Sequence, residues 1–303
     1  MNRREFLKKS AKYAVAAAGA FSLSGAESLL GSERGVDLAA VKGGTPGKMF
    51  DAGINALGGI KNFVKPNQTV VVKPNIGWDV IPEYAANTNP ELVAVIVRRC
   101  IQAGAKRVYV FDHTCDNWIR VYKNSGIEHA AKTAGAVVAP GNNESYYHET
   151  AVPGGKSLKK TKIHELIFES DVFINVPVLK HHGTTRVTIG MKNLMGNIWD
   201  RRSWHVTDLH QRIADFTPVR KPDLTVVDCY RVMTANGPRG VAGGRDVVKM
   251  ESQVLSRDIV AADSAAARIF GADPMDIAHI KNAAERKMGE SDLSKLNIRR
   301  ITL

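Results

Sequence analysis

The densest set of side chains able to do chemistry lies between residues 179 and 205. This stretch, LKHHGTTRVTIGMKNLMGNIWDRRSWH, combines cationic, amide and imidazole groups. Ammonium and guanidinium groups neutralise carboxylates and phosphates, and imidazoles move protons near neutral pH. A solvated basic loop with two ordinary histidines is the alternative interpretation. The candidates are Lys180, His181, His182, Arg186, Lys192, Asn193 and His205.

We predict catalytic roles for His181 and Lys192, and anion-binding roles for Lys180, Arg186 and Asn193. Lys192 and Asn193 precede a turn that contains glycine, where an ammonium and an amide can meet an anion. The residue types therefore favour a small anionic substrate over a neutral one.

A divalent metal, or a cofactor that contains one, is a further expectation for this stretch. His182, His205 and Asp228 are the candidate ligands. Adjacent side chains of a strand point to opposite faces, so His181 and His182 are not both expected to bind one metal unless the loop is irregular. For Asp228, helix capping is the alternative.

Further polar residues follow other predicted strands. Lys73 and Asn75 come after a β-branched run, and Asp112, His113 and Cys115 follow the next strand. In open parallel sheets, ligands bind beyond the carboxyl ends of the strands. We therefore expect Lys73 and Asn75 to bind an anion, and His113 to act as a catalytic group that moves a proton.

We expect the candidate residues to meet in one pocket. If it exists, Lys73, His113, His181 and Lys192 lie within the span of one small ligand, in a cavity of about 300–1,000 Å³. If the stretch is only a basic loop, these residues scatter over the surface. We expect Lys192→Met to leave folding nearly unchanged, because a loop lysine is normally exposed.

The elements that must position these residues alternate between strands and helices. Strands are predicted at 69–75, 107–112, 171–179 and 223–230, and helices at 90–104, 125–135 and 259–271. Continuous apolar strands with helices between them indicate a parallel sheet covered on both faces. The fold class is therefore α/β, with a mostly parallel sheet and helices on both faces, arranged as one body or as two lobes.

The first 26 residues resemble a twin-arginine export signal. Arg3 and Arg4 precede an Ala-rich apolar run that is too short for a stable membrane anchor and that ends in small residues, with cleavage expected after Ala26. We predict this signal over 1–26, a linker over 27–47 and a single α/β domain over 48–303. The Tat translocase is then a partner, and the protein is periplasmic or otherwise extracytoplasmic, tethered to the membrane if the signal stays uncleaved.

Composition excludes several classes of protein. The chain has 303 residues, of which 44% are hydrophobic and 24% charged, which rules out disorder and collagen-like repeats. The net charge of +12 lies partly in the leader and is otherwise spread without interleaved aromatic residues, so no nucleic acid is expected. The three cysteines are far apart, so no iron–sulfur cluster is expected.

Several motifs together resemble the family called domain of unknown function 362. They are VVVKPN, TNPELVAVIVRRCIQAGAKRVYVFD, DVFINVPVLKHHGTTRVTIGMKNLMGNI, NGPRG and SRDIVAADSAAARIFG. The resemblance runs from about residue 69 to the end of the chain and implies a bacterial or archaeal protein. Some members of that family carry a ferredoxin-type domain, and this chain has no cysteine-rich module of that kind.

The chain is also similar, more faintly, to lactate racemase, an enzyme that epimerises a 2-hydroxy acid with a nickel-pincer cofactor. The resemblance implies that His113 corresponds to a strand-end histidine and His181 or His182 to a later one. It also implies a cofactor-holding lysine at Lys192 and a nickel ligand at His205. The order of the residues agrees, but FDHT stands in place of Gly-x-His-Arg and GMKN in place of Gly-Gly-x-Lys.

The function expected from these patterns is an exported enzyme that binds a small anionic substrate with a metal or a metal-containing cofactor. The alternative is a non-catalytic metal-binding or redox-accessory protein, with a redox partner. Metal-dependent turnover would favour the enzyme, and tightly bound metal without turnover would favour the accessory protein.

Overall fold

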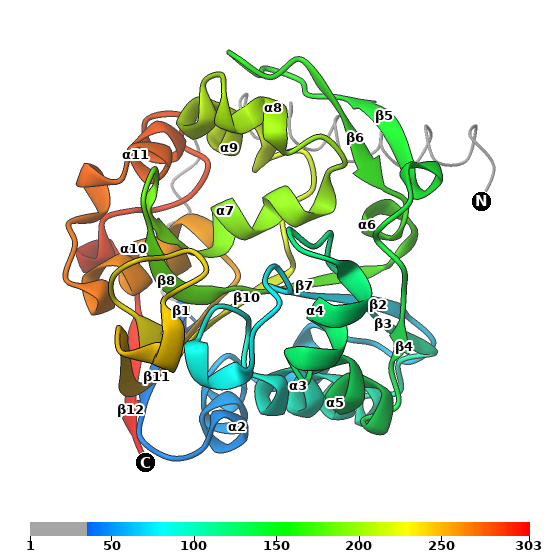
Figure 1. The fold of residues 1–303 in the computed structure, drawn as a ribbon. Coiled ribbons are helices and arrows are strands. Elements are labelled where there is room, and N and C mark those ends of the chain that lie inside the picture. Colours follow the sequence, from blue (N-terminus) through cyan, green and yellow to red (C-terminus); the bar gives the residue numbers. More distant parts are fainter. Residues whose placement is uncertain (1–34) are drawn as a thin grey trace, which may run out of the picture.

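The computed structural model describes residues 35–303, in which a ten-stranded, mostly parallel sheet carries helices on both faces (Figure 1). The predicted signal peptide, with Arg3, Arg4 and the cleavage point after Ala26, lies outside the described residues. The predicted α/β fold with a mostly parallel sheet is confirmed. No helix among the described residues is long and apolar enough to cross a membrane.

The main sheet is ordered so that the first and last described strands are neighbours. Its strands, in order across the sheet, are β12 (Ile298–Thr302), β1 (Leu38–Lys42), β11 (Val247–Ser256), β10 (Leu224–Met233), β7 (Val172–Val176), β2 (Thr69–Pro74), β3 (Arg107–Val110) and β4 (Val137–Val138). β11 runs antiparallel to both of its neighbours, while β10, β7, β2, β3 and β4 are parallel.

Two further strands extend the sheet where the site lies. β8 (Val178–His182) pairs with β10 and, through a tight antiparallel turn, with β9 (Arg186–Thr188). A separate antiparallel hairpin, β5 (Tyr147–Ala151) and β6 (Lys160–His164), stands above the sheet in Figure 1.

Helices cover the sheet in two layers (Figure 1). One layer holds α2 (Pro46–Ala56), α3 (Pro90–Gln102), α4 (Trp118–Asn124) and α5 (Ile127–Thr133). The other holds α6 (Leu166–Glu169), α7 (Gly190–Asn193), α8 (Arg202–His205), α9 (Leu209–Phe216), α10 (Ile259–Phe270) and α11 (Ala278–Glu285). Because side chains alternate along a strand, Val70 and Val72 pack on the first layer and Val71 on the second.

Local sequence explains where the longer helices begin and end. Asn89 caps α3 by accepting a hydrogen bond from Glu91 N at 2.9 Å, and Pro90 occupies the first turn. Asp258 caps α10, and Gly271 ends it in the left-handed conformation with φ 83°. The helix predicted at 259–271 therefore lies where its capping residues place it.

Several segments differ from the prediction. Residues 38–42, predicted as linker, form β1 inside the sheet. The predicted strand 171–179 is broken into β7 and β8 at Pro177, which has no N–H for a sheet hydrogen bond. β11 and the β5–β6 hairpin were not predicted, because their polar residues weaken the apolar pattern of a buried strand.

Candidate functional site

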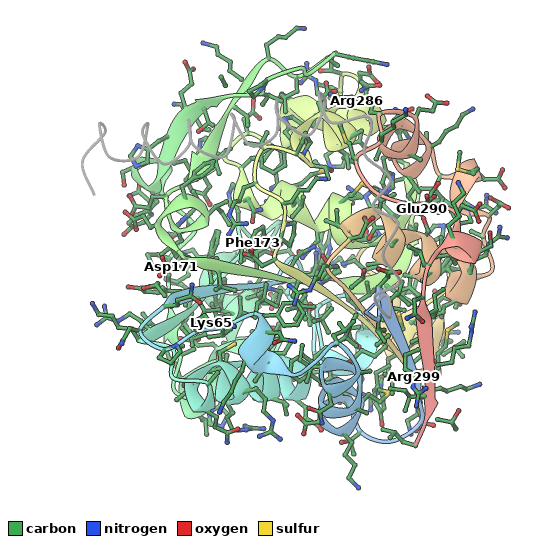
Figure 2. The ribbon with its side chains drawn as sticks, turned by 180° about the vertical axis from the view of Figure 1, so that it is seen from behind. Lys65, Asp171, Phe173, Arg286, Glu290 and Arg299 are labelled. Carbon is green, nitrogen blue, oxygen red and sulfur yellow. The ribbon has the colours of Figure 1, made fainter. Side chains whose placement is uncertain are left out.

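A cavity of about 720 Å³ opens at the carboxyl ends of β2 and β3, beside β8 and α7. In Figure 2, which shows the molecule from behind, Asp171 marks the opposite end of these strands, where it accepts a hydrogen bond from Thr69 N at 2.8 Å. The cavity thus lies on the edge where polar residues follow the strands. Of the predicted site residues, the structure brings together Lys73, Asn75, His113, Lys180, His182, Lys192, Asn193 and His205.

β8 places alternate side chains in the cavity. Lys180 and His182 line it, and His181 between them does not, because neighbouring strand residues point to opposite faces. His181 Nδ1 instead accepts a hydrogen bond from Gly237 N at 3.0 Å. The expectation that His181 shares a pocket with Lys73, His113 and Lys192 is therefore wrong, and His182 takes that place.

Arg186 and Asp228 also lie outside the cavity. Arg186 is exposed in the β8–β9 turn and faces Asp276, with 3.4 Å between Nη1 and Oδ2. Asp228 accepts hydrogen bonds from Asn89 N at 2.8 Å and Tyr230 N at 3.0 Å, and burial raises its pKa to about 6. Asp228 therefore holds the backbone of Asn89, the residue that caps α3, and does not line the cavity.

Lys73 is fully buried and has protein partners for all its donors. Register pairs Lys73 with Asn175 of β7, which directs it toward α7. Its Nζ lies 2.9 Å from each of three oxygens, Pro74 O, Asn193 Oδ1 and Asp112 Oδ1. Burial lowers the pKa of Lys73, and the Asp112 carboxylate opposes that shift. Lys73 therefore positions its neighbours and has no N–H left for a ligand, contrary to the anion-binding role predicted for it.

Asn193 joins Lys73 and Lys180 into one buried hydrogen-bond network. Its Oδ1 accepts hydrogen bonds from Lys73 and from Asn75 Nδ2 at 3.0 Å, and its Nδ2 donates to Asn175 Oδ1 at 2.9 Å. Asn75 Oδ1 accepts in turn from Lys180 Nζ at 3.0 Å. Each amide is thus fixed in one orientation by partners on both of its ends.

Lys180 and Lys192 have fewer protein partners than N–H groups, so each ammonium can still donate to a ligand. Lys180 Nζ donates to Asn75 and to the carbonyl of Ala86, and burial lowers its pKa to about 7. Lys192 is 8% exposed, and burial lowers its pKa to about 8. Among the described residues, its Nζ meets only Met195 Sδ, at 3.7 Å. Lys192 is buried, so the expectation of an exposed loop lysine is wrong.

The backbone of α7 is held by a carboxylate from α10. Asp263 is fully buried and accepts hydrogen bonds from Gly190 N at 2.6 Å and Met191 N at 2.9 Å. Burial raises the pKa of Asp263 to about 7 despite these two bonds. A Cβ on Gly190 would lie 2.6 Å from Asp263 Oδ1, so this close approach requires glycine. The GMKN and VAADSAAARIFG motifs therefore contact each other through these two hydrogen bonds.

His113 has a free nitrogen facing the cavity. Its Nδ1 lies 2.9 Å from the carbonyl of Ile198, so Nδ1 carries the proton and Nε2 carries the lone pair. The ring stacks on Trp199 at 4.9 Å between centroids with an interplanar angle of 2°. Burial lowers the pKa of His113, so the ring is neutral at pH 7 and can accept a proton.

His182 has the opposite tautomer. Its Nδ1 accepts hydrogen bonds from Thr184 N at 3.1 Å and Thr185 N at 3.3 Å, and burial lowers its pKa to about 2. The neutral ring must then carry its proton on Nε2, which makes it a hydrogen-bond donor. His205 stacks beside it at 6.0 Å between centroids, and burial lowers its pKa to about 4.

These residues do not fit the predicted metal site. A metal needs a nitrogen lone pair, and the lone pair of His182 is taken by two backbone N–H groups. Asp228, the third predicted ligand, binds the backbone of Asn89 outside the cavity. Among residues 35–303, no group of three or more His, Cys, Asp or Glu side chains is arranged to hold a metal ion. The cavity presents ammonium, guanidinium and amide groups together with the Nε2 atom of His113.

Sequence reasoning missed two residues that complete the cavity wall. Arg201 donates from its guanidinium to His113 O at 2.6 Å and Thr114 O at 2.5 Å, and Trp199 supports the His113 ring. Both follow the MKNLMG motif directly, in IWDRR. Only this proximity could have indicated them, because nothing in the spacing predicts that the chain returns to His113.

The fold and the site define an α/β protein with a cationic, histidine-containing cavity at the carboxyl edge of a parallel sheet. Residues 70–268, more than half of the chain, match the family described as domain of unknown function (DUF362), and the chain belongs to that family. The family resemblance drawn from the motifs is confirmed.

Two individual proteins are similar to the chain. A thylakoid-associated protein of Synechocystis sp. is 25% identical over 244 residues, covering 78% of this chain and 73% of that protein. The lactate racemase apoprotein from Thermoanaerobacterium thermosaccharolyticum aligns with a TM-score of 0.47 at 11% identity. That alignment covers 74% of this chain, which spans only 55% of the racemase.

Proposed function

We propose that the protein is an enzyme that binds a small carboxylate or phosphate anion in the cavity and moves a proton on it. The observation that carries this proposal is Lys192, an ammonium group that is 8% exposed and has no acidic or oxygen partner among the described residues. An unpaired buried charge costs several kcal/mol, so it needs a counter-ion. An anionic ligand in the cavity supplies one.

The charges around the cavity support the same conclusion. Lys73, Lys180, Lys192, Arg201 and Arg202 line it against two carboxylates. One of the carboxylates, Asp112, is already paired with Lys73, and the other, Asp200, is exposed. The volume of about 720 Å³ is typical of a small-molecule site. The wall therefore attracts an anion of small-molecule size.

The two histidines supply complementary proton chemistry. His113 presents a lone pair on Nε2, which suits a general base, and His182 presents an N–H, which suits a donor to an oxyanion. An anion held by Lys180 and Lys192 would have its neighbouring C–H or O–H bond next to a base and a donor. Proton abstraction beside a carboxylate is the reaction class that uses all of these groups.

Calorimetric titration with oxalate and with inorganic phosphate tests the binding step. We expect one of the two anions to bind the wild-type protein, and Lys192→Met to weaken it at least tenfold. Lys159→Met is the matched control, because Lys159 lies outside the cavity and donates to Gly155 O at 2.7 Å. Equal affinity in the two variants would refute the proposal.

Solvent exchange tests the proton step. In D₂O, a panel of 2-hydroxy and 2-oxo acids is followed by NMR for loss of the proton on the carbon beside the carboxylate. We expect His113→Gln to abolish exchange while oxalate affinity stays within about threefold. Exchange that survives this substitution would remove His113 as the base.

A further inference from the structure

Cys115 is the one exposed thiol among the chain's three cysteines, all of which lie within the described residues. Cys100 and Cys229 are fully buried, and burial raises the pKa of both thiols, that of Cys100 to about 12. Cys115 instead lines the cavity that holds Lys180 and Lys192. The proton chemistry proposed above does not use it.

The loop that carries Cys115 is fixed from two sides. Gly77 O accepts hydrogen bonds from Cys115 N at 2.9 Å and Asp116 N at 3.2 Å. On the other side, the Arg201 guanidinium donates to the carbonyls of His113 and Thr114. Hydrogen bonds on both sides of the loop after β3 therefore hold the Cys115 thiol at the cavity.

Cationic side chains line the same cavity as Cys115, among them Lys180, Lys192 and Arg201. A Cβ placed on Gly77 would lie 3.8 Å from Cys115 Sγ and 3.6 Å from Asn75 Oδ1, the atom that accepts from Lys180. After burial, the negative charge of a Cys115 thiolate is the largest influence on the pKa of Lys180 and Lys192, and it raises both. Lys192, nine-tenths buried and without an oxygen partner among residues 35–303, lines the same cavity as the Cys115 thiol.

We propose that Cys115 is a nucleophile and that the anion bound in the cavity carries an electrophilic carbonyl carbon, as an aldehyde acid or a 2-oxo acid does. This inference rests on the proposed function, because the anion must bind first. It also names the substrate class more closely. The lysines hold the carboxylate, and the carbonyl carbon faces the sulfur.

The step is an addition that needs no further reagent. The Cys115 thiolate forms a bond to the carbonyl carbon, and the π bond of the carbonyl opens onto its oxygen. That oxygen takes a proton from the Lys192 ammonium, which leaves a thiohemiacetal and a neutral amine. The reverse sequence releases the substrate.

Alkylation of the native protein tests the placement of the thiol. A free thiolate repels iodoacetate, which is negatively charged, and reacts faster with neutral iodoacetamide. In the folded protein we expect Cys115 to react faster with iodoacetate, because the two lysines attract it, while Cys100 and Cys229 stay unmodified. Lys192→Met should restore the ordinary preference, and Lys159→Met should not, as read by peptide mass spectrometry.

A ¹³C-labelled aldehyde acid tests the chemistry itself. With [2-¹³C]glyoxylate we expect an NMR signal from a thiohemiacetal carbon in wild-type protein and none in Cys115→Ala. If oxalate binds but glyoxylate gives no adduct, or iodoacetate shows no preference, the nucleophile is refuted and the anion site stands. If neither oxalate nor phosphate binds, the proposed function fails, and this inference fails with it.

Discussion

If the cavity binds an anion as proposed, two buried lysines make that binding depend on pH. Burial lowers the pKa of Lys180 to about 7 and that of Lys192 to about 8, so each loses its proton within the range where most proteins are studied. The charged forms attract an anion and the neutral forms do not. Anion binding is therefore linked to the protonation of these two groups.

We expect oxalate affinity to be greatest below about pH 7 and to fall as pH rises through the two lysine pKa values. Above both values, the loss approaches about tenfold per pH unit for each proton that binding requires. Calorimetry from pH 6 to 9 measures this dependence, and Lys180→Met should make it shallower. An affinity that rises with pH would contradict the assignment.

Gly196 is packed against the Lys73–Asp112 ion pair. A Cβ at this position would lie 1.8 Å from Asp112 Oδ1 and 2.6 Å from Lys73 Nζ. We expect Gly196→Ala to separate the pair and to lower the free energy of unfolding by about 3 kcal/mol. Gly183→Ala is the control, because nothing lies within 4 Å of a Cβ there, and it should change stability by less than about 0.5 kcal/mol. Denaturant unfolding of the two variants compares them, and equal stabilities would refute the steric argument.

The sequence predicted which lysines and histidines gather at the site more accurately than it predicted their roles. Lys73 lies near the carboxyl end of β2 and Lys192 lies in α7, and both line one cavity. Whether the N–H groups of Lys73 are free depends on Asp112 and Asn193, which come from segments distant from Lys73. Partners of this kind leave no signal in local spacing. The different roles of the lysines were therefore not predictable from the sequence.

At the scale of elements, the short helix α7 depends on α10. Asp263 is the only described side chain that accepts hydrogen bonds from both Gly190 N and Met191 N, the first N–H groups of α7. Without it, two buried donors lose their partner and Lys192 loses its fixed position. We expect Asp263→Ala to cost about 3 kcal/mol of stability and to weaken oxalate binding at least tenfold.

The pH dependence of stability distinguishes the hydrogen-bonding role of Asp263 from a role in packing alone. Because the folded-state pKa of Asp263 is raised to about 7, its contribution to stability is fully present below about pH 4 and is lost as pH rises through about 7. The stability advantage of wild type over Asp263→Asn should therefore decline across that range. An advantage that grows with pH in urea unfolding would show that the carboxylate is ionised and stabilising.

Elements with a strong apolar pattern were predicted well, and those stabilised by partners were not. The helix over 259–271 and the strand over 107–112 carry their own capping or β-branched signals. β11 and β1 do not, because their stability comes from pairing with each other, at Ala40 with Val254 for example. Local sequence did not show which of the two adjacent histidines of β8 would face the cavity, and the choice of His181 was wrong.

At the scale of the whole molecule, we propose that the chain is exported through the twin-arginine route. Replacing Arg3 and Arg4 with lysine keeps the charge and removes the pair that the receptor reads. We expect the double variant to stay in the cytoplasmic fraction of a Tat-competent bacterium. Lys8→Arg with Lys9→Arg is the charge-matched control, and it should be exported as wild type is. Periplasmic accumulation of the double variant would contradict the proposal.

The position of β1 has a consequence for how the protein is made. β1 lies between β11 and β12, pairing in parallel with the last strand from Leu38 beside Ile298 to Lys42 beside Thr302. Among the described strands, β1 is translated first, and its partners β11 and β12 follow long after it in the chain. Nascent chains that stop before β11 leave β1 without either neighbour. This edge of the sheet therefore forms only after β11 and β12 have been synthesised.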